Sequence, residues 1–403
     1  MSFEDTTQTG PVGGRSLGVS SGEFRAVQRD NPAAMAATEP HTAPQPNLHY
    51  VFDDPNDGEV GRDKVLAHLL WELTLLAGVV VAGYLLVEAA PGAISRSLYL
   101  TGALTLLLGA ASALGLRAGV PNLAVGGVAV LAGVFVSTQA DGSWGGTTGL
   151  AIAICAGLGL VQGLVVVGLH VPAWAASVAA LMAFSTWASA HHLRAPDTGY
   201  DPVSDAYVWF GGVAAFSVVL SLVGLHPALR RGFARFRPVT DPARRRGTSA
   251  GIIAVAATVA SSVLAALAGA LLALTDALPR TGAGDLGALY TALGLGVALL
   301  GGTSACGRRG GIFGSVLAAA LVTLVLAWVT IKQPDWSAAY VLAAAIVVGL
   351  LATRLVERFG RPVLRTPGDE DEAWVRTHAV AQPPTPWQGG LWSSDESWGS
   401  PRR

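Results

Sequence analysis

Few residues in the long apolar segments of this chain carry side chains that could do chemistry. Glu72 is the one carboxylate that lies well inside such a segment. A carboxylate at this kind of place often marks a path for ions or protons. It is more commonly a residue that is paired, or that reaches toward the membrane surface from near a helix end. The scarcity of such groups weakens the case for an ion-coupled carrier.

A group of two histidines and three aspartates lies between two apolar runs. Its members are His191, His192, Asp197, Asp201 and Asp205. These side chains could bind a metal, but their spacing matches no metal motif, and solvated loop residues are the favoured interpretation. The two cysteines, Cys155 and Cys306, are too few and too distant for a disulfide framework or a zinc site. The sequence therefore predicts no metal site, no cofactor and no catalytic residue, and it does not indicate an enzyme.

The segment Arg117–Gly127 places glycine, proline and asparagine directly before an apolar run. Gly119, Pro121, Asn122 and Gly126 interrupt helical hydrogen bonding there. In membranes, interrupted helices occur where the freed backbone groups face protein or a water-filled cavity. Asn122 and its neighbouring peptide groups could thus line a path for a polar solute. The alternative is a simple turn with Pro121 in the first turn of the next helix. The residues alone favour neither.

A glycine-rich loop precedes another apolar run. It contains Gly301, Gly302, Thr303, Ser304 and Gly310. Glycine-rich loops before helices can cradle phosphate, but this one lacks the order G-x-x-x-x-G-K-[ST], and no Gly-Lys pair occurs anywhere in the chain. We therefore expect a tight reversal between two helices, in which some of the glycines adopt positive backbone angles.

The longest connection between apolar runs, residues 226–248, carries seven arginines. Asp241 followed by proline is typical of a helix start. We expect the part from Arg235 to Gly247 to form a short helix that docks on a cytosolic partner, with Asp241 as the cap and Arg244 in a charged contact. A helix that lies on anionic lipid is the alternative.

These residues belong to a chain that is 51% hydrophobic and only 13% charged. That composition indicates a membrane protein, and the net charge of −1 gives no indication of nucleic-acid binding. A helix needs about 20 apolar residues to cross a bilayer. Ten runs fit, and we expect an all-α bundle of about ten transmembrane helices. The runs are 66–88, 98–116, 121–139, 148–169, 172–192, 206–225, 249–275, 286–304, 311–331 and 337–353.

The expected organisation is a membrane domain at residues 65–356 between two polar tails. Residues 1–64 and 357–403 are expected to be disordered cytoplasmic segments, and we expect no cleavable signal peptide in the polar segment before residue 65. Arginine-rich connections normally stay in the cytoplasm. Placing the loop 226–248 there puts both termini inside and the loops 140–147 and 193–205 outside.

Taken in their order along the chain, these segments resemble the permease subunits of ribose-type ABC importers, which are related to the branched-chain amino acid permeases. Gly119 to Gly126 is similar to the family pattern G-G-x-D-L-S-V-G, with Asn122 in place of the usual aspartate. Gly301-Gly302-Thr303-Ser304 followed by Gly307, Gly310 and Gly314 resembles its G-G-T-S-L-x-G-G-x-G-x-x-x-G motif. The resemblance covers residues 65–356. In the coupling loop only Asp241, Ala243, Arg244 and Gly247 approximate the family pattern, and Arg230 to Arg237 depart from it.

The resemblance implies a multi-pass protein of the bacterial plasma membrane that forms the path for a small polar solute. It implies several partners: cytosolic ABC ATPase subunits, a second permease subunit, an extracytoplasmic solute-binding protein and membrane lipid. ATP hydrolysis would belong to the separate ATPase, since this chain has no Walker A motif. The lack of charge in the spans favours a neutral solute such as a sugar or nucleoside. A branched-chain amino acid-type permease and an ion-coupled secondary carrier remain alternatives.

Overall fold

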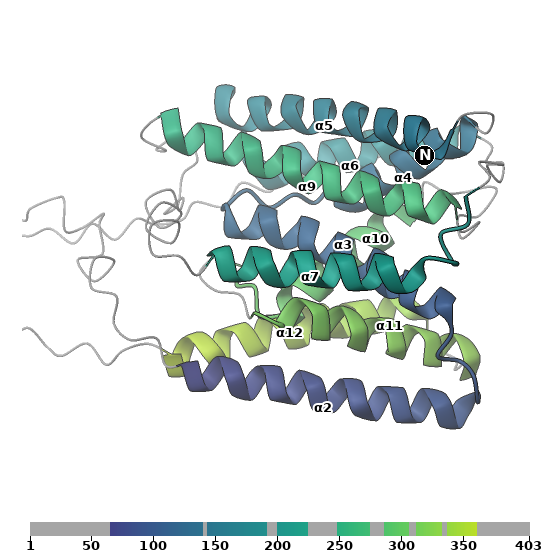
Figure 1. Cartoon of the computed structure of the whole chain (residues 1–403). Coiled ribbons are helices and arrows are strands. Elements are labelled where there is room, and N and C mark those ends of the chain that lie inside the picture. The colour runs from purple at the N-terminus through teal and green to yellow at the C-terminus, as the bar shows by residue number, and fades with distance from the viewer. Residues whose placement is uncertain are drawn as a thin grey trace, which may run out of the picture. The chain divides into compact units, whose positions relative to one another are not determined.

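The computed structural model of the protein describes residues 65–139, 143–191, 200–224, 248–274, 286–305, 312–332 and 337–360. Contacts divide the chain into Met1–Pro55 and Asn56–Arg403, and every described residue lies in the second unit. These residues form ten α-helices and no strand (Figure 1). In chain order the helices are α2 (Val65–Ala89), α3 (Arg96–Arg117), α4 (Val125–Thr138), α5 (Trp144–Gly168), α6 (Ala173–Ser189), α7 (Ala206–Gly224), α9 (Thr248–Leu274), α10 (Leu286–Leu300), α11 (Gly314–Lys332) and α12 (Ala338–Gly360).

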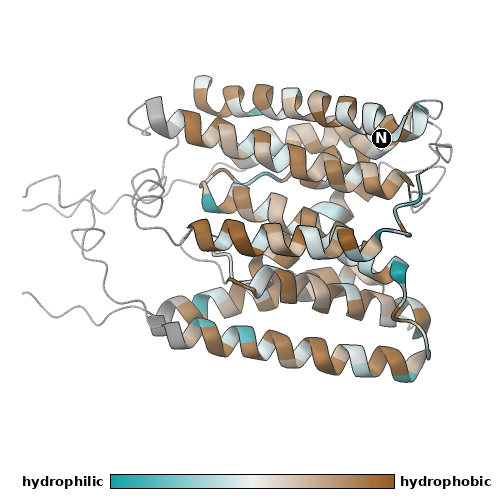
Figure 2. Ribbon diagram, viewed as in Figure 1, coloured by the Kyte–Doolittle hydropathy of each residue, from teal (hydrophilic) through white to brown (hydrophobic). Residues whose placement is uncertain are grey.

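Seven of these helices are long and apolar enough to cross a membrane, namely α2, α3, α5, α7, α9, α11 and α12. By length and composition they identify an all-α, multi-pass membrane protein. Hydrophobic residues cover most of each helix, and hydrophilic residues gather toward the helix ends and the connections (Figure 2). The helices α4, α6 and α10 are shorter. The 14 residues of α4 make a rod of about 21 Å, less than the hydrocarbon core of about 30 Å.

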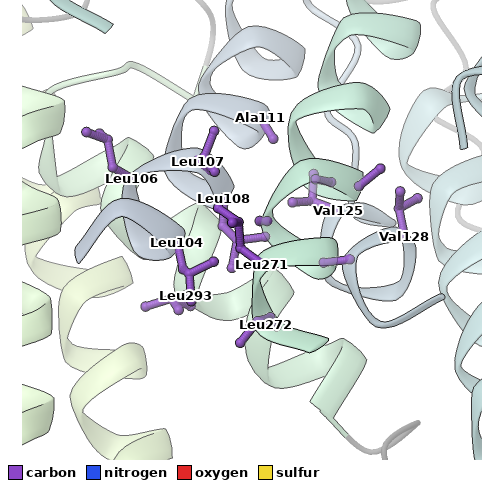
Figure 3. Close-up of a cluster of buried hydrophobic side chains, with 14 of the residues drawn as sticks. Leu104, Leu106, Leu107, Leu108, Ala111, Val125, Val128, Leu271, Leu272 and Leu293 are labelled. Atoms are coloured by element: carbon purple, nitrogen blue, oxygen red, sulfur yellow. The ribbon is translucent and has the colours of Figure 1, made fainter. Parts of the chain in front are cut away.

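Helix α3 lies at the centre of the bundle. It packs against α7, α9, α10 and α11, while α9 also runs along α4 and α5, and α2 packs on α11. Leucine and valine side chains from α3, α4, α9 and α10 converge in one buried cluster, in which Leu108, Val128, Leu271 and Leu293 take part (Figure 3). The short helices α4 and α10 are therefore largely covered by protein.

Glycines at three positions along α3 allow other parts of the chain to pack closely against this helix. A Cβ at Gly102 would lie 3.0 Å from the Phe210 ring of α7, and one at Gly109 would overlap Val297 of α10. At Gly115 it would lie 2.9 Å from the Val120 carbonyl oxygen. Small residues of this kind let membrane helices approach closely, since van der Waals contact drives much of their packing.

Several helix boundaries differ from the expected spans by a few residues, and two of these differences have a local cause. The span expected at 121–139 becomes helical only at Val125, because Pro121 and Asn122 form a non-helical segment. The span expected at 286–304 ends its helix at Leu300, where two glycines follow. The last helix continues to Gly360, four residues into the segment assigned to the C-terminal tail. The rest of both tails lies outside the described residues.

Candidate functional site

The connection between α3 and α4 is partly buried, with Val120, Asn122 and Ala124 fully covered. Helix α3 ends where Gly119 adopts a φ of 68°. The Val120 N–H donates to the Gly115 carbonyl at 2.9 Å, and the Gly119 N–H donates to the Leu116 carbonyl at 3.1 Å. This pair of bonds is the Schellman ending, which glycine allows without strain. Val120 is only 2% exposed, so the chain turns inward after α3.

Asn122 is the centre of a buried polar node, 2% exposed. Its Nδ2 donates to Ser261 Oγ of α9 at 3.1 Å. Its Oδ1 accepts from Gln162 Nε2 of α5 at 3.2 Å and from the Ala124 N–H at 3.0 Å. The amide therefore ties the start of α4 to two long helices. Donor and acceptor are both used, as a buried side chain requires.

The next turn of α4 is fixed to α10. The Gly126 N–H donates to Thr291 Oγ1 at 3.1 Å, and this hydroxyl contacts the carbonyls of Leu123 and Gly287 at 3.0 and 2.9 Å. A Cβ on Gly126 would overlap the Gly287 carbonyl oxygen. Pro121 takes part through its carbonyl, which accepts from Ser177 Oγ of α6 at 3.4 Å. The segment containing Gly119, Pro121, Asn122 and Gly126 thus meets α5, α6, α9 and α10.

The glycine loop after α10 begins with the same helix ending. Gly302 has a φ of 88°. The Thr303 N–H donates to the Ala298 carbonyl and the Gly302 N–H to the Leu299 carbonyl, both at 3.0 Å. Thr303 and Ser304 are buried, at 0% and 4% exposed. Gly301 faces the start of α11 so closely that a Cβ on Gly314 would overlap the Gly301 carbonyl.

Two adjacent residues of α2 hold this loop at both sides. The Trp71 indole donates to the carbonyl of Leu300, the last residue of α10, at 2.9 Å. The Glu72 Oε1 accepts from the Phe313 and Gly314 N–H groups at 3.0 and 3.2 Å. Free N–H groups at a helix start attract a carboxylate. Glu72 is therefore a cap supplied from another helix, which agrees with the interpretation as a paired residue near a helix end.

A small cavity lies beside this contact, with a volume of about 10 Å³. It is close to the space of a single water molecule and too small for a solute. Its lining comes from α2, the glycine loop and α12: His68, Trp71, Gly302, Ser304, Ala352, Thr353 and Val356.

The polar group between α6 and α7 is only partly described. His191 stacks on Trp187 with ring centroids 4.0 Å apart, and its Nδ1 lies 2.7 Å from the Trp187 carbonyl oxygen. The Asp201 carboxylate accepts from the Val203 N–H at 2.9 Å. Burial, together with the nearby Asp205 and Asp201 carboxylates, raises the pKa of the Tyr200 phenol. The described part of the chain contains no group of three or more His, Cys, Asp or Glu placed to hold a metal.

Several expected site residues lie outside the described residues. They are Arg235, Asp241, Arg244 and Gly247 of the arginine-rich loop, and Gly310 of the glycine loop. Among the described ones, the structure brings Asn122 and Gly126 into one polar segment. The glycine loop joins α10 to α11 elsewhere in the bundle.

Sequence reasoning missed three partners of the α3–α4 connection: Gln162, Ser261 and Thr291. Each is a polar residue in an otherwise apolar run, with Ser262 directly after Ser261, and that polarity was the available signal. In hydrocarbon such a residue needs a partner, so isolated polar residues in different spans are candidates to meet.

Comparison of the chain with protein-family models, with curated proteins and with solved structures finds no match. The resemblance to ribose-type permeases therefore rests on the short motifs quoted above.

Proposed function

We propose that this protein is the permease subunit of a bacterial ATP-binding cassette importer for a small polar solute. The observation that carries the proposal is the non-helical connection between α3 and α4, with its buried polar node at Asn122. Non-helical backbone at membrane depth is expensive, and it occurs where it is covered by protein or lines a path.

In this proposal all ten helices lie in the plasma membrane and both termini are cytoplasmic. The short helices α4 and α10 cross the core together with the non-helical segments that precede or follow them. The node at Asn122, Gln162 and Ser261 is closed in the structure. Transport would require α4 to separate from α5 or α9, so that the amide groups exchange their mutual hydrogen bonds for bonds to solute or water.

Neutral amides and hydroxyls suit a sugar or nucleoside better than an ion. Backbone dipoles at the same break would also suit a zwitterion, so a branched-chain amino acid remains the alternative solute. The partners would be two ATPase subunits, a second permease subunit and an extracytoplasmic binding protein, in contact with membrane lipid.

An ion-coupled secondary carrier is the competing function. It needs a titratable group in the translocation path. Glu72 is the only carboxylate well inside an apolar run, and both of its described contacts are backbone N–H groups at the start of α11. This arrangement favours the importer.

Coupling to an ATPase provides the test. Reversing Arg244 to Glu should break a charged contact between the loop and the ATPase. Loss of one partner of a buried charged contact costs about 2–5 kcal/mol. We expect the variant to insert and fold, but to lose both copurification with the ATPase and ATP-driven uptake. Arg231→Glu, in the half of the loop that departs from the family pattern, is the matched control and should retain both.

Two results would contradict the proposal at different levels. Normal uptake and normal copurification of the Arg244→Glu protein would remove Arg244 from the contact. Solute movement down an ion gradient in vesicles that contain the purified chain and no ATPase would reject the importer itself.

A further inference from the structure

An open cleft lies between α4, α5 and α6, away from the polar node. Its volume is about 390 Å³. The three helices lie together in the part of the bundle that contains α5 (Figure 1). The lining includes the small side chains of Ala132 on α4 and Ala151 on α5, together with larger apolar side chains. The lining residues are Leu131, Ala132, Phe135, Ala151, Ile154, Cys155, Leu158, Phe184 and Trp187.

The longest part of the cleft lining lies on α5. Its four residues on α5, from Ala151 to Leu158, recur at the spacing i, i+3, i+4, i+7, which is one face of a helix. Seven residues of helix cover about 10 Å, roughly a third of a hydrocarbon core about 30 Å thick. The lining on α5 and on α4 lies around the middle of each helix, and the lining on α6 lies in its second half.

Every lining side chain is apolar or, for Cys155, a buried thiol. A dry apolar cavity of about 150 Å³ already binds benzene, so this larger space is suited to hydrocarbon and not to water or sugar. It is also accessible, because Ile154 and Trp187 on its border are 40% and 38% exposed. The surface on either side continues with exposed Leu150 of α5 and Met182 of α6. The cleft is thus an indentation in a surface that faces lipid.

We propose that this cleft binds one acyl chain of a bilayer phospholipid. The surrounding medium is hydrocarbon, and an empty groove of this size would leave its lining without contacts on one side. The apolar lining of the cleft and its extent of about 10 Å along α5 suit a segment of an acyl chain that lies along that helix. Trp187 borders the cleft near the end of α6, so its indole can report what the cleft holds. The proposal requires only a membrane-embedded protein and is independent of the importer function.

Quenching of tryptophan fluorescence by phospholipids with dibrominated acyl chains tests this site in reconstituted bilayers. The contribution of Trp187 is the difference between the wild type and Trp187→Phe. Trp174, at the other end of α6 and 59% exposed, is the matched control because it faces outward but does not line the cleft. Ala132→Phe and Ala151→Leu fill the cleft from two different helices.

In the wild type we expect both tryptophans to be quenched. In either filled variant, quenching of Trp187 should fall roughly two-fold, since one side of the ring then contacts protein instead of lipid, while quenching of Trp174 stays the same. Unchanged quenching of Trp187 in a folded, filled variant would overturn the proposal. So would a Trp187 that is unquenched in the wild type, which is the result expected if a second copy of the chain covers the cleft.

A second measurement uses the unaltered protein, in case neither filled variant folds. A phospholipid with a photoreactive group in its acyl chain should label peptides 151–158 and 184–187 more strongly than the exposed α2 surface at Val80, Val81 and Tyr84. Equal labelling of the two surfaces would show ordinary lipid contact and reject a binding site.

Discussion

At the scale of single residues, Asn122 shows why a neutral amide suits this position. Gln162 and the Ala124 N–H both donate to it, whereas Ser261 accepts from it. Asparagine provides both functions without a charge. The family pattern that this segment resembles has an aspartate here. An aspartate would have three hydrogen-bond donors only if the Ser261 hydroxyl rotated to donate. None of the three partners carries a positive charge that would balance the carboxylate. The departure from the family pattern therefore has a local physical reason.

Replacing Asn122 by leucine should leave Gln162, Ser261 and the Ala124 N–H without their hydrogen bonds to this side chain. An unsatisfied buried polar group costs about 1–3 kcal/mol, so we expect a clear fall in the melting temperature of the detergent-solubilised protein. Asn122→Asp should lie between the wild type and the leucine variant. Ser137→Ala is the control, because Ser137 is also buried on α4 but bonds only to its own helix at Gly133. If the Asn122→Leu variant has the melting temperature of the wild type, the node does not stabilise the fold.

Substitutions at Glu72 can distinguish a helix cap from an ion-binding site. Glutamine keeps an oxygen that can accept from Phe313 and Gly314, whereas leucine does not. If Glu72 caps α11, Glu72→Gln should transport normally, and Glu72→Leu should lose about 0.5–2 kcal/mol of stability, the usual worth of a cap. Uptake assays and melting temperatures measure the two effects. A folded Glu72→Gln protein that has lost transport would instead support a titrating group in the path.

At the scale of elements, the endings of α3 and α10 use one device twice. Gly119 and Gly302 both take positive φ, with equivalent pairs of backbone bonds behind them. Each ending stops a helix and satisfies the carbonyls of buried residues. The two short central helices, α4 and α10, each lie beside one of these endings.

We expect Gly119→Val and Gly302→Val to lower the yield and melting temperature of folded protein. A non-glycine residue in this left-handed region costs about 1–2 kcal/mol, and a β-branched one is the least tolerated. Asparagine at either position should recover much of the loss, because it adopts positive φ more easily. Gly157→Ala, on the open surface of α5, is the control and should be neutral or slightly stabilising. Valine variants with normal melting temperatures would contradict the role of these angles.

The positions of the long helices could be predicted from the sequence, whereas their neighbours could not. An apolar run of about 20 residues is a sufficient signal for a span. Lipid and protein interior are equally apolar, however, so hydropathy does not indicate which helix is central. Helix α3 has the lowest mean hydropathy of the seven long helices and is the most buried. The polar node could not be predicted either, because it depends on which helices are neighbours. Its bond from Asn122 to Ser261 joins residues 139 positions apart.

At the scale of the whole molecule, orientation in the membrane decides which surfaces meet an ATPase and which meet a binding protein. Reporter fusions at both termini and in the loop 226–248 should give cytoplasmic signals, and fusions near Asp141 and Asp201 should give outside signals. The reason is the seven arginines of that loop. An outside signal from the arginine-rich loop would invert the proposed topology and move the ATPase contact elsewhere.

The contact of α2 with the glycine loop also has a consequence for biosynthesis. Helix α2 is the first of the described helices to leave the ribosome, yet the groups that Trp71 and Glu72 bind come 229 and 241 residues later. At roughly 5–20 residues per second, a separation of 241 residues corresponds to roughly 12–50 s of synthesis. During that time α2 resides in the membrane with a carboxylate whose final partners do not yet exist. The first helix to insert is thus among the last to be fixed, and release of α11 from the ribosome is the event that completes its site.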